Sequence, residues 1–169
     1  MEFIDLKTQQ SKIKSKIEMR IQSVLDHGKY IMGPEVYDLE KRLADYVGVK
    51  YCISCSSGTD ALLIPLMAKG IGPGDAVITT PFTYIATAEV VSLLGAEPIF
   101  VDIYESTYNI NPNGIEKAIQ EAERKGLVAK AIIPVDLFGL PARYRLIKDL
   151  AKKYGLMAVS YTHLRAHET

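Results

Sequence analysis

A Ser-Gly-Thr turn at residues 57–59 joins a short apolar segment, residues 51–55, to a helical pattern that begins at Thr59. A strand that runs into a helix directs several backbone N–H groups, and the positive end of the helix dipole, towards one point. The hydroxyls of Ser57 and Thr59 add donors, and Gly58 lets a ligand approach the backbone closely. These residue types in this order predict a phosphate-binding site.

Two further side chains follow predicted strands and are candidates for the same site. Tyr84 follows the apolar run 76–80, and its ring is either a stacking surface for a planar ligand or one more core aromatic. Taken alone, the segment favours the core aromatic. Asp136 ends the apolar run 129–135 and is either a polar site residue or a turn former. The pattern does not decide between these two roles.

Other spacings that could carry chemistry do not predict a site. Cys52 and Cys55 have a C-x-x-C spacing, but residues three apart on a strand face opposite sides, so buried core cysteines are favoured over a metal or redox site. The glycines within residues 70–74 precede a strand and therefore predict a helix-to-strand turn. His163 and His167 stand four apart, but no further ligand accompanies them, so no metal site is expected.

The N-terminal part of the chain predicts two helices. The first is indicated by apolar residues that recur at helical spacing between Ile13 and Leu25, and Gly28 supplies its stop. The second begins at Pro34, since proline favours the first position of a helix. The apolar residues of the second helix recur at helical spacing and predict its buried face: Val36, Leu39, Leu43 and Tyr46.

Beyond residue 50, strand and helix patterns alternate. Strands are predicted over residues 51–55, 76–80, 98–101, 129–135 and 156–159, with helices over 59–69 and 84–94 and from residues 112 and 141. The strands are continuously apolar, as in parallel sheets that helices cover on both faces. We therefore predict a doubly wound α/β fold, whose ligands lie beyond the carboxyl ends of the strands.

Composition narrows the class of protein. The chain has 169 residues, 48% of them hydrophobic, and its 20 basic residues balance its 20 acidic ones. One compact domain with a sizeable core is expected, and no surface for nucleic acid is indicated. The N-terminus is not a signal peptide and no uncharged run is long enough to span a bilayer, so no membrane partner and a cytoplasmic location are expected.

Seven motifs in order resemble one family. The chain carries Phe3-Ile4-Asp5-Leu6-Lys7, Gly33-Pro34-Glu35-Val36, Ser57-Gly58-Thr59-Asp60-Ala61-Leu62, Gly72-Pro73-Gly74-Asp75, Pro81-Phe82-Thr83-Tyr84-Ile85-Ala86-Thr87, Phe100-Val101-Asp102 and Ile133-Pro134-Val135-Asp136-Leu137-Phe138-Gly139. Together they closely resemble the sugar-nucleotide aminotransferases of the DegT/StrS family, over residues 1–159. An ordered set of motifs is far more specific than any one of them.

The resemblance implies a fold and an activity. The fold is that of the aspartate aminotransferases, a three-layer α/β/α arrangement of fold type I, and residues 1–159 would be the N-terminal part of its large domain. Members use pyridoxal 5′-phosphate (PLP), act as homodimers and move an amino group, usually from glutamate, onto a keto-sugar attached to a nucleotide. Such reactions belong to the synthesis of polysaccharide or antibiotic sugars.

The resemblance also assigns roles to residues. Gly58, Thr59 and Asp60 would hold the PLP phosphate through backbone N–H groups and the Thr59 hydroxyl, with the Asp60 carboxylate pointing away from the phosphate. Tyr84 matches the family's aromatic residue that stacks on the pyridine ring.

Residues 160–169 depart from the family. Tyr161 stands where the family has the Asp that pairs with the pyridinium nitrogen, and no lysine matches the family's Schiff-base position. No catalytic residue is therefore assigned, and we expect a full-length parent to be an aminotransferase and this polypeptide alone to be inactive. The tail resembles a translated sequencing adapter, and a truncated gene product is the alternative.

Two other functions stay open at this point. A PLP-dependent sugar dehydratase has the same fold and carries His in place of the lysine. A non-catalytic module that binds phosphate or dimerises would retain the Ser57 to Asp60 turn without any chemistry.

Overall fold

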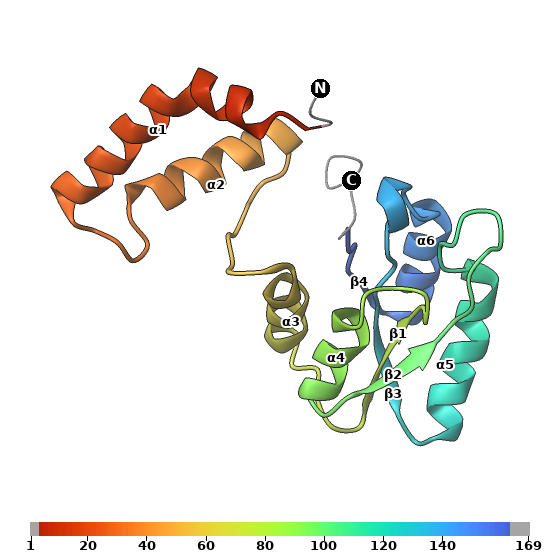
Figure 1. Ribbon diagram of the computed structural model, residues 1–169. Coiled ribbons are helices and arrows are strands. Elements are labelled where there is room, and N and C mark those ends of the chain that lie inside the picture. Colours follow the sequence, from red (N-terminus) through yellow and green to blue (C-terminus); the bar gives the residue numbers. More distant parts are fainter. Residues whose placement is uncertain (1–3, 163–169) are drawn as a thin grey trace. The chain divides into compact units, whose positions relative to one another are not determined.

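The computed structural model describes residues 4–162, and the chain divides into two compact units, Met1–Ser54 and Cys55–Thr169. Each unit is described by itself (Figure 1). Within the described residues, no helix combines the length and apolar character needed to cross a membrane. No cluster of three or more His, Cys, Asp or Glu side chains suited to a metal ion occurs among these residues.

The first unit consists of two helices, α1 (Leu6–His27) and α2 (Pro34–Val47). Asp5 caps α1 by accepting a hydrogen bond from the Thr8 amide (2.9 Å), and Gly28 ends it with a left-handed φ of 65°. Pro34 occupies the first turn of α2, as the sequence predicted. Both helices are therefore explained by signals at their own ends.

The predicted buried face of α2 is wrong. Ala44 is the buried residue of this helix, whereas Leu39 is 51% exposed and Tyr46 89% exposed; Leu43 is also exposed and Val36 is partly buried. Helical spacing shows which residues share a face, but burial also needs a second apolar surface to cover that face.

The second unit is an α/β fold. Its elements in order are α3 (Gly58–Ala68), β1 (Asp75–Thr79), α4 (Ala86–Leu93), β2 (Glu97–Phe100), η1 (Pro112–Gly114), α5 (Ile115–Arg124), β3 (Val128–Ile132), η2 (Leu137–Gly139), α6 (Tyr144–Tyr154) and β4 (Met157–Ala158). The strands form a parallel sheet in the order β2-β1-β3-β4. The predicted parallel α/β fold is confirmed.

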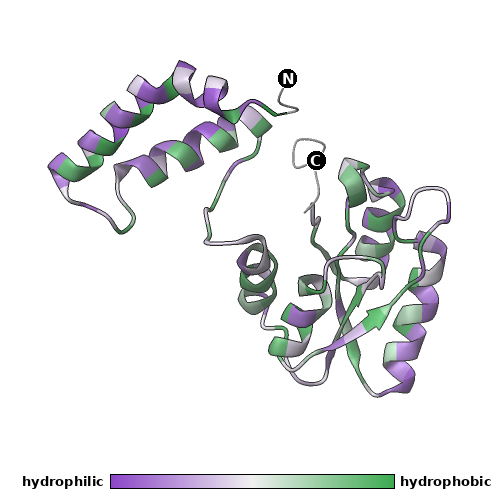
Figure 2. Ribbon diagram, in the orientation of Figure 1, coloured by the Kyte–Doolittle hydropathy of each residue, from purple (hydrophilic) through white to green (hydrophobic). Residues whose placement is uncertain are grey.

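Helices cover both faces of this sheet (Figure 1). Ile78 of β1 points to the core shared with α5 and α6, while its neighbour Val77 points to the core shared with α3 and α4. Successive strand residues face opposite sides, so one strand supplies both cores. Figure 2 shows hydrophilic and hydrophobic residues mixed along α5 and a largely hydrophobic α3.

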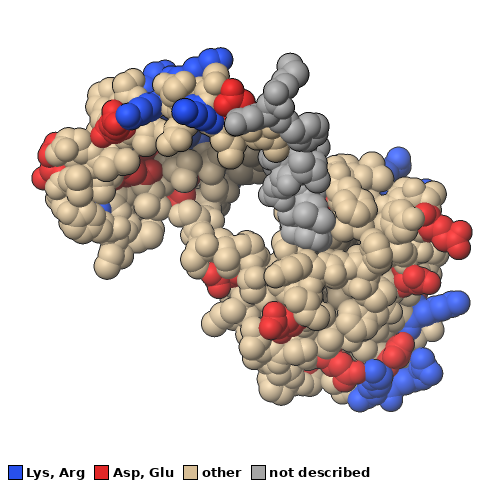
Figure 3. Space-filling view, in the orientation of Figure 1, with Lys and Arg blue, Asp and Glu red and all other residues tan. Residues whose placement is uncertain are grey.

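Charged side chains of both signs gather at the end of α5 and the start of β2. Figure 3 shows both signs of charge over the end of α5, where Lys125 Nζ lies 2.5 Å from Glu97 Oε1 and 3.5 Å from Glu121 Oε1. Such exposed pairs contribute little to stability. The sheet edge that carries the predicted ligand site is therefore positioned by apolar packing rather than by these charges.

The predicted strand over residues 51–55 is not formed, and none of the described strands pairs with this segment. A strand exists only where a neighbour takes up its backbone hydrogen bonds, which the apolar run alone cannot show. The prediction of buried cysteines fails with it, because Cys52 is partly buried and Cys55 is exposed. His163 and His167 lie outside the described residues.

Candidate functional site

The start of α3 keeps two backbone donors available. Ser57 has an extended backbone (φ −156°, ψ 166°), and its Oγ accepts a hydrogen bond from the Asp60 amide (3.1 Å). The Ser57 carbonyl takes the Ala61 amide (3.0 Å). Within residues 4–162, no acceptor is bonded to the amides of Gly58 and Thr59. These two amides, with the helix dipole, form a place that favours an anion.

The absence of a side chain at Gly58 is not required by the protein's own packing. A Cβ atom built there would meet only Tyr161, at 3.8 Å from Cε2 and 3.9 Å from the hydroxyl oxygen, which are ordinary contacts. The residue also has no positive φ. Neither packing nor backbone conformation among the described residues therefore requires glycine at this position.

The Asp60 carboxylate is held by the loop that precedes α3. It accepts hydrogen bonds from the Ser56 hydroxyl and, at 3.0 Å, from the Ser57 hydroxyl. These bonds, that of Ser56 first, lower the pKa of Asp60 below its usual value and keep the carboxylate ionised. The Ser57 hydroxyl, expected to donate to a phosphate, is thus used within the protein, whereas the Thr59 hydroxyl has no such bond among the described residues.

The role of Ser56 was missed in the sequence. A signal was present, because Ser57 and Asp60 have the spacing of a capping box, in which a serine caps a helix and an acid three residues later bonds back to the preceding loop. That pattern predicts that the acid faces Ser56 and Ser57 rather than an incoming anion.

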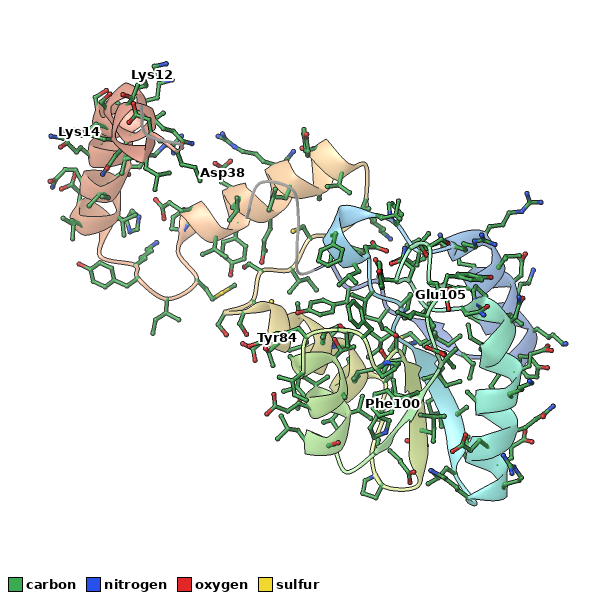
Figure 4. All side chains as sticks on the ribbon, turned by 45° about the vertical axis from the view of Figure 1, so that its right-hand side comes forward. Lys12, Lys14, Asp38, Tyr84, Phe100 and Glu105 are labelled. Carbon is green, nitrogen blue, oxygen red and sulfur yellow. The ribbon has the colours of Figure 1, made fainter. Side chains whose placement is uncertain are left out.

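Tyr84 lies in the loop between β1 and α4 and is labelled in Figure 4. Its carbonyl accepts a hydrogen bond from the Thr87 amide (3.1 Å), at the start of α4, and its side chain is 57% exposed. The residue is therefore not a core aromatic. This loop follows the carboxyl end of β1, and the start of α3 lies beside Tyr161, which pairs with Val135 beyond the end of β3. Both segments therefore lie at the carboxyl edge of the sheet, where ligands of such folds bind.

Asp136 is an internal anchor. Its Oδ1 accepts hydrogen bonds from the Ala142 amide (2.9 Å) and the Tyr144 hydroxyl (2.7 Å), and its Oδ2 from the hydroxyls of Ser160 (3.2 Å) and Thr162 (3.1 Å). The residue is only 9% exposed. Of the two roles left open by the sequence, the structural one is present, since the carboxylate joins the end of β3 to α6 and to residues 160–162.

The Tyr144 hydroxyl stays a donor at neutral pH. Burial raises the pKa of this phenol, a hydrogen bond with Ser160 opposes the rise, and the neighbouring Asp136 adds to it. Hydrogen bonds to a carboxylate are stronger than neutral ones, so this contact strengthens the anchor.

Tyr161 continues the sheet beyond β4. Its amide donates to the Pro134 carbonyl (3.1 Å), its carbonyl accepts from the Asp136 amide (2.8 Å), and it forms a parallel bridge with Val135. The side chain is 8% exposed and belongs to the core on the α3 and α4 side. It also lies beside Gly58. The structure thus brings Tyr161 and the start of α3 together at one edge of the sheet.

This fold and site define a class of protein. The chain belongs to the DegT/DnrJ/EryC1/StrS aminotransferase family, whose sequence pattern matches residues 11–161. A relative in Pseudomonas aeruginosa, UDP-2-acetamido-2-deoxy-3-oxo-D-glucuronate aminotransferase, is 57% identical over 159 residues, which are 94% of this chain and 43% of that protein. Further relatives are named as aminotransferases of UDP- or dTDP-linked sugars. The chain spans less than half the length of these relatives.

Solved structures agree with the family. A DegT/DnrJ/EryC1/StrS aminotransferase from Brucella abortus matches with a TM-score of 0.88 and 50% identity, covering 95% of this chain and 43% of that one. The ntda protein of Bacillus subtilis, solved with its bound cofactor PMP, matches with a TM-score of 0.79 and 37% identity, covering 86% and 32%. PMP, the amino form of PLP, is thus found in a solved relative of this fold.

Proposed function

We propose that residues 1–159 form the N-terminal part of the large domain of a PLP-dependent transferase, and that residues 160–169 do not belong to that domain. The full-length parent moves an amino group from glutamate onto a nucleotide-linked keto-sugar and works as a homodimer in the cytoplasm. The observation that carries the proposal is the pair of available amides at Gly58 and Thr59.

The residues of this chain fit the phosphate of PLP. The amides of Gly58 and Thr59 and the Thr59 hydroxyl supply donors at the positive end of α3. Asp60 contributes indirectly, because its amide is capped by Ser57 and its carboxylate is held by Ser56 and Ser57. The exposed ring of Tyr84, at the same edge of the sheet, orients a planar ring by stacking.

The residues of this chain fit the ring of PLP less well than they fit its phosphate. When bound in such enzymes, PLP supplies an electron sink at its protonated ring. A carboxylate keeps the ring nitrogen protonated, whereas Tyr161 offers only a neutral phenol at this position. We therefore expect the polypeptide of residues 1–169 alone to carry out no amino transfer.

The activity test uses the purified 169-residue chain and a full-length protein that continues residues 1–159 with the family's own segment. Each receives PLP, glutamate and a nucleotide-linked 3-keto or 4-keto sugar, and the amino sugar is measured by mass spectrometry. We expect product only from the full-length protein. Turnover by the 169-residue chain would refute the proposed inactivity, and a dehydrated sugar formed without glutamate would identify a dehydratase instead.

The binding role of Thr59 is tested in the full-length protein. Thr59→Val removes the hydroxyl but keeps the shape, and we expect PLP to bind about 10- to 100-fold more weakly, since a hydrogen bond to a charged group contributes about 1.5–3 kcal/mol. Absorbance of the bound coenzyme gives the affinity. Thr8→Val, at the exposed start of α1, is the matched control and should leave it unchanged.

A further inference from the structure

We propose that Tyr161 determines which ligands the start of α3 accepts, by occupying the space in which the ring of PLP would lie. The inference rests on the proposed function, in that the amides of Gly58 and Thr59 are taken as the phosphate-binding end of the site. The added claim is that this polypeptide excludes PLP because there is no room for the pyridine ring, although the donors for the phosphate are present.

The backbone fixes the direction of the Tyr161 side chain. Hydrogen bonds to Pro134 and from Asp136 place residue 161 in register beside the end of β3. Successive residues of an extended segment point to opposite faces. Ser160 and Thr162 accordingly reach Asp136, and Tyr161 points to the other face, where α3 lies.

The Tyr161 side chain is long enough to reach the start of α3. The Tyr161 Cε2 atom and hydroxyl oxygen lie 3.8 and 3.9 Å from the position of a Cβ atom on Gly58. The resemblance to the family implies Asp at this position, and tyrosine carries a phenol ring, of the size of pyridine, in place of the carboxylate. The Tyr161 side chain begins at the position from which the family's Asp would contact the ring nitrogen of PLP, and it ends beside the turn that would hold the phosphate. It therefore occupies the space between these two points, where the ring of PLP would lie.

Packing holds the ring in this place. Tyr161 is 8% exposed and belongs to a core cluster with Leu62, Val135 and Leu137. To admit a ligand ring, the protein would have to expose this aromatic side chain or release residues 160–162 from Asp136. Both changes cost free energy, so the exclusion is a property of the folded state.

The experiment measures binding of pyridoxamine 5′-phosphate to the 169-residue chain by equilibrium dialysis. This probe is preferred because it cannot form a Schiff base with surface lysines. The unmodified chain and Tyr161→Phe, which keeps the ring, should show no saturable binding. Tyr161→Asp and Tyr161→Leu should show saturable binding, at least about tenfold tighter than the weakest binding that the dialysis would detect for the unmodified chain. The Leu variant retains apolar contact with the core and serves if the Asp variant fails to fold. Tyr46→Leu, at an exposed tyrosine of α2, is the matched control and should behave as the unmodified chain.

Two outcomes would overturn the inference. One is binding by the unmodified chain that equals binding by Tyr161→Leu. The other is no gain in a Tyr161→Leu chain that still unfolds cooperatively in urea, because Tyr161 would then not be what excludes the ring. The proposed function is judged separately, by PLP absorbance and amino transfer in the full-length protein, so the two failures are distinguishable.

Discussion

The two units of this chain use similar sequence patterns with different results. In α1, Ile13, Ile17, Ile21 and Leu25 recur at helical spacing, yet the helix has no buried residue. In α5, a comparable pattern buries Ile115 and three further residues against the sheet. A glycine with positive φ follows each helix, Gly28 after α1 and Gly126 beyond α5, so helix formation itself does not separate them.

The difference lies in what each helix can pack against. The second unit has a sheet whose strands present apolar residues on both faces, and each face takes a pair of helices. The first unit, taken by itself, offers α1 only a second helix within residues 4–54. Local preferences therefore determine where a helix begins and ends, whereas burial depends on a layer built from distant parts of the chain.

Truncation of a buried isoleucine should separate the two units most clearly. Ile132→Ala, in β3 at 0% exposure, should lower the free energy of unfolding by about 2–5 kcal/mol, because it leaves a cavity in the sheet core. Ile21→Ala makes the same chemical change in α1 at 54% exposure and should stay within about 0.5 kcal/mol. Urea unfolding measures both. Equal losses would contradict the difference in packing.

Removal of a charge tests the anchor in the second unit. Asp136→Asn replaces an acceptor of four hydrogen bonds with an amide that accepts at one atom only, and should cost about 1–3 kcal/mol. The matched change Asp38→Asn affects only a surface ion pair with Arg42 in α2 and should stay within about 0.5 kcal/mol. A cost for Asp136→Asn no larger than the control's would show that the anchor is not needed.

The smallest expected effect is a change in the pKa values of two carboxyl groups, one in each unit. The pKa of Asp60 is lowered by the Ser56 and Ser57 hydroxyls, and that of Asp5 by Thr8. A carboxyl whose folded-state pKa is lowered stabilises the protein above its unfolded pKa, near 4, and this contribution is lost as the pH falls through the folded value. Carboxyl-carbon NMR should find both pKa values depressed.

Ser56→Ala should raise the pKa of Asp60 towards its usual value and leave that of Asp5 unchanged, since the two carboxylates belong to different units. Asp5 is thus an internal control in the same titration. If the pKa of Asp60 stayed the same in Ser56→Ala, the hydrogen bond from Ser56 would not be what lowers it.

Sequence reasoning succeeded where a signal is local. The start of α3, the proline-led start of α2 and the glycine stop of α1 all lie within about two residues of their predictions. It failed for residues 51–55, which read as a strand but have no partner among the described strands. It left Asp136 undecided, because the hydroxyls that bond to its Oδ2 come from residues 24 and 26 positions later in the chain.

The sequence by itself determined the order of helices and strands from the start of α3 onward and the family, since each depends on neighbouring residues or on ordered motifs. Only the tertiary structure decided that most of the apolar face of α2 stays exposed, that Asp136 is an internal anchor and that Tyr161 reaches Gly58. Backbone dihedrals and caps are set within a few residues, whereas burial and side-chain contact depend on segments that meet only after folding.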